Sequence, residues 1–118
     1  MPTLKIVTTL TFPVASEASP VAAPPFEFEL VYTQKNVDDV VFGGVTTDAD
    51  LMGRITDAKA CFVQCLAGAG DLKVNGSTPT IPLKAGTGFW AFANPDGGLT
   101  DLTVSTADAA SFRLYMFS

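Results

Sequence analysis

Histidine is absent from all 118 residues of this chain. Without an imidazole, the chain cannot build a Ser-His-Asp or Cys-His catalytic arrangement or a metal centre held by histidine ligands. The sequence also lacks a glycine-rich loop of the type that cradles phosphates. These absences argue against an enzyme, and we expect no catalytic residue, no cofactor and no bound metal.

Charged side chains are scarce, at 16% of the chain against a usual share of about 25%. The seven basic residues are scattered, with no two adjacent, and the net charge is −5. A chain without a basic stripe cannot neutralise a row of phosphates, so we expect neither nucleic acid nor a membrane as a partner. Apolar residues make up 47%, and we expect a neighbouring subunit to cover part of that apolar surface.

The chain also lacks long apolar runs and has only two cysteines, Cys61 and Cys65. No apolar run approaches the roughly 20 residues that a membrane-spanning helix needs, and residues 1–12 lack the continuous apolar core of a signal peptide.

On one strand, Cys61 and Cys65 would share a face about 13 Å apart, too far for a disulfide. We therefore expect buried free thiols and synthesis in a reducing compartment.

Short segments of alternating apolar and polar residues fill most of the chain. Gly, Pro, Asn and Asp separate them, most clearly at residues 75–76 and 94–98. Turns at such spacing indicate a sandwich or a barrel, and eight strands in two sheets is the number in a jelly roll. We predict one all-β domain over residues 1–118, an antiparallel β-sandwich of jelly-roll type with about eight strands. The expected strands are 3–12, 26–33, 37–45, 59–66, 71–74, 80–84, 87–93, 99–105 and 111–117.

Residues 46–56 carry no clear strand pattern. We expect a loop over residues 46–50, and either a short strand or one helical turn over 51–56. Asp48 and Asp50 could offer oxygen ligands to calcium. Their spacing does not match an EF-hand loop, and a solvated turn is the simpler interpretation.

The N-terminal segment, residues 1–25, differs from the rest. Leu4, Ile6, Leu10 and Phe12 share one face at a period of two, whereas residues 13–25 hold four prolines. Proline donates no N–H, so this segment cannot form an inner strand. We expect an arm that docks on a neighbouring subunit and adds its first strand to a sheet edge. The alternative is a mobile surface loop.

Aromatic residues suggest further contact surfaces. Trp90 and Phe92 fall on one face of their segment, and a lone tryptophan there is expected in the core or in a subunit interface. An alternative is a platform on which a sugar ring stacks.

In the last strand, Phe112, Leu114 and Met116 alternate with Arg113, Tyr115 and Phe117, and a strand that is apolar on both faces is normally covered on both sides. The interface candidates are Leu4, Ile6, Leu10, Phe12, Trp90, Tyr115 and Phe117.

Four segments of the C-terminal half carry a resemblance: DLKVNG at residues 71–76, IPLKAG at 81–86, GFWAF at 88–92 and GGLTDLTV at 97–104. In this succession the chain resembles small jelly-roll-like β-sandwich structural proteins of tailed bacteriophage virions. The resemblance implies a non-enzymatic virion protein that assembles in many copies in the host cytoplasm, most simply a capsid decoration or cement protein. Its partners would be itself, as a ring or trimer, and a major virion protein. The alternatives are a tail or adaptor component, and a carbohydrate-binding β-sandwich module.

Overall fold

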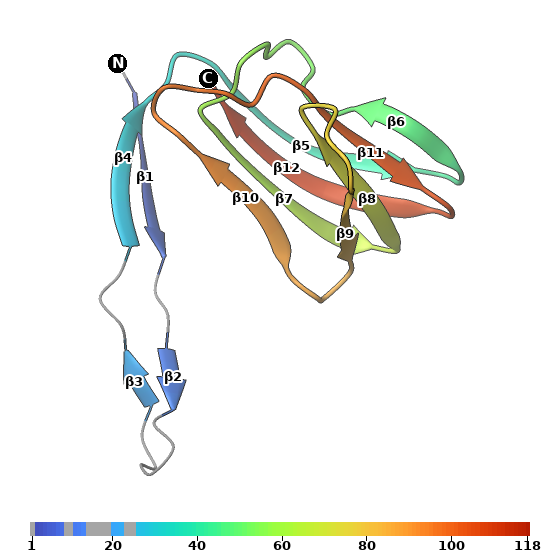
Figure 1. The fold of residues 1–118 in the computed structure, drawn as a ribbon, viewed down its shortest axis with the longest axis horizontal. Coiled ribbons are helices and arrows are strands. Elements are labelled where there is room, and N and C mark those ends of the chain that lie inside the picture. Colours follow the sequence, from blue (N-terminus) through green and yellow to red (C-terminus); the bar gives the residue numbers. More distant parts are fainter. Residues whose placement is uncertain (1, 9–10, 14–19, 23–25) are drawn as a thin grey trace. The chain divides into compact units, whose positions relative to one another are not determined.

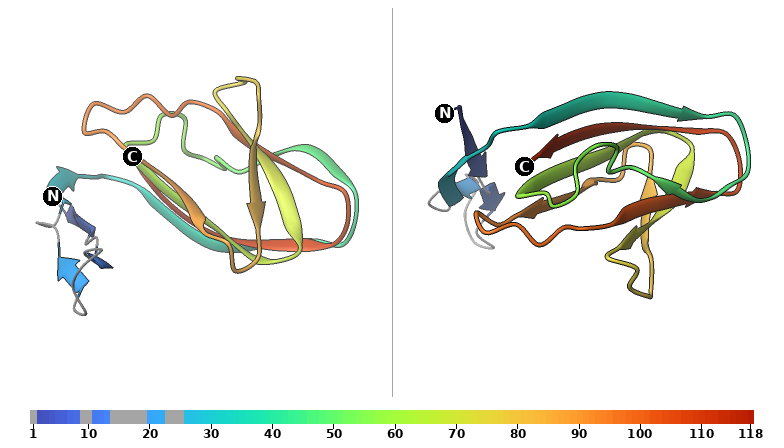
Figure 2. Two further views of the ribbon diagram at one scale, coloured as in Figure 1. Left: turned by 60° about the horizontal axis from the view of Figure 1, so that its bottom comes forward. Right: turned by 90° about the horizontal axis from the view of Figure 1, so that it is seen from above.

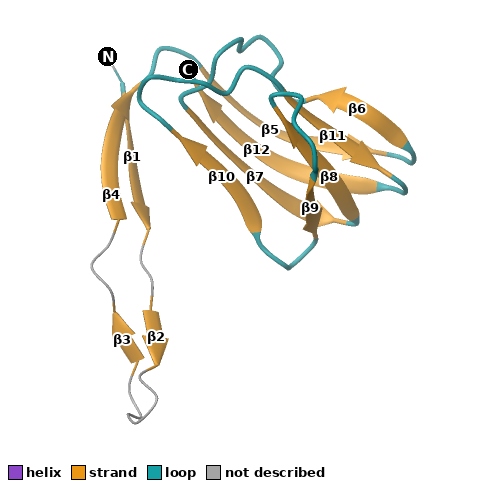
Figure 3. Cartoon of the chain, in the orientation of Figure 1, coloured by secondary structure: helices purple, strands orange, loops and turns teal. Residues whose placement is uncertain are grey.

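The computed structural model of the chain describes residues 2–8, 11–13, 20–22 and 26–118, and every regular element within these ranges is a strand (Figure 3). Every ladder among these residues is antiparallel, which confirms the prediction of an all-β, antiparallel chain. No helix in the described ranges is long and apolar enough to cross a membrane. The strands are β1 (Thr3–Thr8), β2 (Thr11–Pro13), β3 (Pro20–Ala22), β4 (Phe26–Val31), β5 (Lys35–Phe42), β6 (Thr46–Asp50), β7 (Ala60–Ala67), β8 (Ala69–Val74), β9 (Ile81–Lys84), β10 (Phe89–Ala93), β11 (Leu102–Thr106) and β12 (Ala110–Phe117).

The chain divides into two compact units, Met1–Val31 and Tyr32–Ser118. In the first, β1 pairs with β4 and β2 pairs with β3 (Figure 1). The expected strand 3–12 is thus described as two shorter strands, and its first part pairs with a strand of its own chain. Pro13 lies opposite Pro20. In a two-stranded sheet each strand keeps an unpaired edge, so a missing N–H is tolerated there.

The second unit is an antiparallel β-sandwich of eight strands. Four pairs are nested along the chain: β5 with β12, β6 with β11, β7 with β10, and β8 with β9. Two further ladders, β12 with β7 and β11 with β8, join them into two sheets. The sheet orders are β10-β7-β12-β5 and β6-β11-β8-β9. Figure 2 shows β5 and β12, from opposite ends of this unit, lying side by side.

The core lies between the two sheets. On β12, Phe112, Leu114 and Met116 are buried, as their alternation predicts, and they belong to one cluster with Leu72 and Leu102 of the other sheet. Burial of such side chains contributes about 1.5–3 kcal/mol each. The period-two pattern of the sequence therefore identifies correctly the face of β12 that stabilises the sandwich.

The expected loop at residues 46–50 is wrong, because these residues form strand β6. Ala49 pairs with Val104 and Asp50 with Thr103 of β11. β6 is an edge strand that pairs with β11 alone, and Ala49 is its one apolar residue, packed against the core. Residues 51–56 form a turn, and neither the short strand nor the helical turn expected there is present.

Cys61 and Cys65 lie on β7 as buried free thiols, as predicted. Burial raises the pKa of both, and that of Cys61 rises from 9.0 to about 12. Cys61 therefore stays protonated in the folded protein over the range in which an exposed thiol ionises.

The free energy of unfolding should consequently fall as the pH rises above 9. The Cys61 thiol ionises first in the unfolded chain, so its contribution is complete below pH 9 and is lost between pH 9 and about 12. The slope from this one group approaches about 1.4 kcal/mol per pH unit. Urea unfolding at several pH values should show that the free energy of unfolding falls less steeply with pH for Cys61→Ala than for the wild type. Identical slopes would contradict the assignment.

Candidate docking surface

The outer face of the β10-β7-β12-β5 sheet carries a continuous row of apolar side chains. The strand registers align Ala91, Phe62, Tyr115 and Val37 across all four strands. Phe89 lies two residues from Ala91 on the same face of β10, because side chains alternate across a pleat. We call these five residues the apolar band. Phe89 is 66% exposed, Val37 55% and Tyr115 39%.

The next row on this face runs from Phe89 through Gln64 and Arg113 to Asp39, and its two charged side chains pair with each other. Arg113 donates from Nε to Asp39 Oδ1 at 2.9 Å and from Nη2 to Asp39 Oδ2 at 3.1 Å. These hydrogen bonds lower the pKa of Asp39 and raise that of Arg113. A hollow of about 160 Å³ lies between the band and this pair, lined by Phe62, Val63, Gln64, Phe89, Arg113 and Tyr115. The charges of Arg113 and Asp39 beside the band are therefore already matched.

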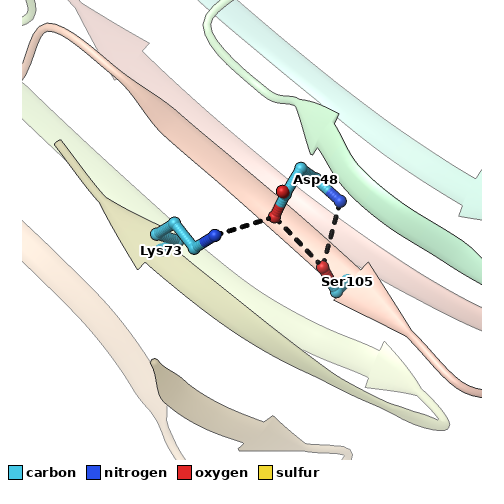
Figure 4. A network of polar contacts seen from close by, with 3 residues as sticks. All are labelled: Asp48, Lys73 and Ser105. Carbon is cyan, nitrogen blue, oxygen red and sulfur yellow. Dashed lines mark hydrogen bonds and ion pairs between the residues drawn. The ribbon is translucent and has the colours of Figure 1, made fainter. Parts of the chain in front are cut away.

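The outer face of the other sheet is polar. Asp48 Oδ1 accepts a hydrogen bond from Lys73 Nζ at 3.2 Å, and the Asp48 N–H donates to Ser105 Oγ at 3.0 Å (Figure 4). Asp50 Oδ1 accepts from the Met52 N–H at 3.0 Å. Among the described residues, no three His, Cys, Asp or Glu side chains gather as metal ligands would. The aspartates considered for calcium thus have protein partners.

The N-terminal candidates lie on short strands of the first unit. Leu4 and Ile6 are half-buried on β1. Phe12 is in β2, but its side chain is outside what the structure describes, and Leu10 is outside the described residues altogether.

Trp90 packs against the core, whereas Phe117 lies on the same face of β12 as Tyr115 but is covered by Tyr32. Trp90 is partly buried against the core, and its ring stacks on that of Phe92 with centroids 6.4 Å apart. Phe117 is 8% exposed and meets Tyr32 edge to face at 5.0 Å. Of the seven sequence candidates, Tyr115 is the one that the structure places in the apolar band.

Sequence reasoning missed Phe89, Val37 and Phe62. For Phe89 a local signal existed, because the residue beside an inward-facing Trp90 must face outward. For Val37 no local signal existed, because its position beside Tyr115 depends on the pairing of β5 with β12. Such pairing between distant segments is a tertiary property.

Comparison with known proteins adds no family: no family model matches the sequence, and a search of curated proteins finds no match. The apolar band and its surroundings are therefore the features of the molecule that point to a function.

Proposed function

We propose that this chain is a non-enzymatic structural protein of a phage virion, a capsid decoration or cement protein whose apolar band binds a flat apolar surface of the major virion protein. The observation that carries the proposal is the contrast between the two outer faces of the sandwich. One exposes aromatic and aliphatic side chains in a row, and the other carries ion-paired and hydroxyl side chains. An exposed apolar face on a small domain marks a site of protein binding.

The extent of the face fits a protein partner. The exposed apolar side chains on it or at its border are Val37, Val41, Leu66, Phe89 and Tyr115. Together they expose roughly 500 Å², more than half of the roughly 800 Å² that each partner contributes to a standard interface. Docking over Arg113 and Asp39 would not bury an unpaired charge there, because these two side chains already neutralise each other.

The nesting of the strand pairs supports the jelly-roll assignment. The four pairs from β5·β12 inward to β8·β9 follow the course of one long hairpin that is folded back on itself. An eight-stranded antiparallel sandwich of this kind is common among capsid proteins. The fold alone does not imply a function, so the apolar band remains the main support.

Virion analysis tests the proposal directly. Mass spectrometry of purified virions should find the protein in hundreds of copies; a dozen or fewer would favour the tail or adaptor alternative, and none would overturn the proposal. Phe89→Asp should weaken rebinding to stripped virions at least tenfold, since it places a charge on the band. Thr47→Asp, with the same charge change on the exposed β6, should rebind normally.

The hollow beside the band favours one candidate of another class, a carbohydrate-binding module. The rings of Phe89 and Tyr115 lie near the polar ends of Gln64 and Arg113, the combination that can stack on and hydrogen-bond a sugar. The platform would then be Tyr115 rather than the inward-facing Trp90. Two results together would favour this alternative. The wild type would bind oligosaccharides saturably and would not rebind to virions, and Tyr115→Ala would abolish the oligosaccharide binding.

A further inference from the structure

The two sheets of the sandwich have four edge strands, and three of them carry features that discourage pairing with another strand. β5 has the adjacent aspartates Asp38 and Asp39, β6 has two aspartates in five residues, and β9 has Pro82 within four residues. Charges, prolines and short length are the usual means of protecting an edge. β10 (Phe89–Ala93) has neither a charge nor a proline. In the described part of the chain, β10 pairs on one side only, with β7.

We infer that β10 pairs with β10 of a second copy of this chain, antiparallel about a two-fold axis at Ala91. The two β10-β7-β12-β5 sheets then form one continuous sheet of twice the width. This inference deepens the proposed function and rests on it for the role of the dimer, which is to present two apolar bands together.

The sequence of β10 suits this register. Pairing about Ala91 sets Trp90 of one copy opposite Phe92 of the other, and Phe89 opposite Ala93. Aromatic pairs across an antiparallel ladder contribute about 0.2–1 kcal/mol each. All five residues of the strand take part, whereas a shift by two residues would leave two of them unpaired. A shift by one residue would pair the inward-facing Trp90 with an outward-facing residue, although paired residues must point to the same face of a sheet.

The same register extends the apolar band across the dimer. In one copy the row runs through Val37, Tyr115, Phe62 and Ala91. A two-fold axis perpendicular to the sheet at Ala91 continues that row into the second copy and keeps both outer faces on the same side. Such an isologous contact is closed, so the pairing stops at two copies. The doubled surface reaches the area that a stable protein interface needs.

A charge-swap experiment on the full chain tests the pairing. The register puts residue 91 of both copies opposite each other, and Ala91 is exposed, so Ala91→Lys and Ala91→Glu should each fold but repel their own kind. In sedimentation velocity, the wild type should form a dimer at micromolar concentration, and each variant should raise the dissociation constant about 100-fold. An equimolar mixture of the two variants should restore the dimer. Val41→Lys, on the opposite edge strand of the same sheet, should dimerise like the wild type.

Each other outcome contradicts the inference. A wild type that stays monomeric excludes the pairing, and a dimer that survives both Ala91 variants uses another surface. Loss of the dimer in both variants without rescue in the mixture excludes this register. Circular dichroism confirms folding, and the emission of Trp90, the only tryptophan of the chain, gives a second readout of association. Virion rebinding is measured separately, so failure of the dimer and failure of the proposed function are distinguishable.

Discussion

Phe112→Ala should lower the free energy of unfolding by about 3–5 kcal/mol. Phe112 is fully buried on β12, and its ring meets that of Phe42 edge to face with centroids 6.1 Å apart. The ring also occupies the space above Gly70, where an added Cβ would lie 2.5 Å from Cζ of Phe112. Truncation would leave a cavity between the two sheets.

Phe89→Ala is the matched control for this change. It removes the same atoms from a ring that is 66% exposed on the outer face of the same sheet, so stability should change by only about 0.5 kcal/mol. Urea unfolding should be compared at a concentration at which both variants are monomeric, with equal m-values as the test of a two-state transition. Similar losses for the two variants would contradict the placement of the core. Since a domain has about 5–15 kcal/mol of stability, the Phe112 variant would lose much of it.

Asn75→Ala should lower the free energy of unfolding by about 2–3 kcal/mol, because Asn75 connects the turn after β8 to the segment that leads into β11. Its Oδ1 accepts from the N–H groups of Thr100 at 2.9 Å and Asp101 at 3.1 Å. Its Nδ2 donates to the Gly98 carbonyl at 2.9 Å. Each such bond contributes about 0.5–1.5 kcal/mol. The residue also has a φ of +50°, which costs alanine about 1–2 kcal/mol.

Asn75→Gly separates these two effects. Glycine adopts a positive φ without strain but makes no side-chain hydrogen bond. The expected order of stability in urea unfolding is wild type, then Asn75→Gly, then Asn75→Ala. If the glycine variant were as stable as the wild type, the hydrogen bonds would contribute nothing and only the turn conformation would matter. If the alanine variant were as stable as the wild type, neither the hydrogen bonds nor the positive φ of Asn75 would contribute to stability.

Most strands could be predicted from the sequence because their signal is local. The alternation of Phe112, Leu114 and Met116 and the turn at Asn75 each depend on a few neighbouring residues. The same period of two set Cys61 and Cys65 on one face of a strand, too far apart for a disulfide, and so predicted free thiols. β6 had no such signal, because an edge strand with aspartates is held by main-chain bonds to a distant strand. Local pattern also could not show that β1 pairs with β4 rather than with another subunit.

The sequence by itself determined that this is an all-β chain without histidine, with short strands, two reduced thiols and too few charges to cover its surface evenly. Only the tertiary structure decided where the exposed apolar side chains gather. Val37 and Tyr115 are far apart along the chain and become neighbours through the register of β5 on β12. That register depends on the joint burial of both sheets, because a shift of β5 by one residue would move its core-facing side chains to the outer face. A property set by the whole sandwich cannot be read from any single segment of it.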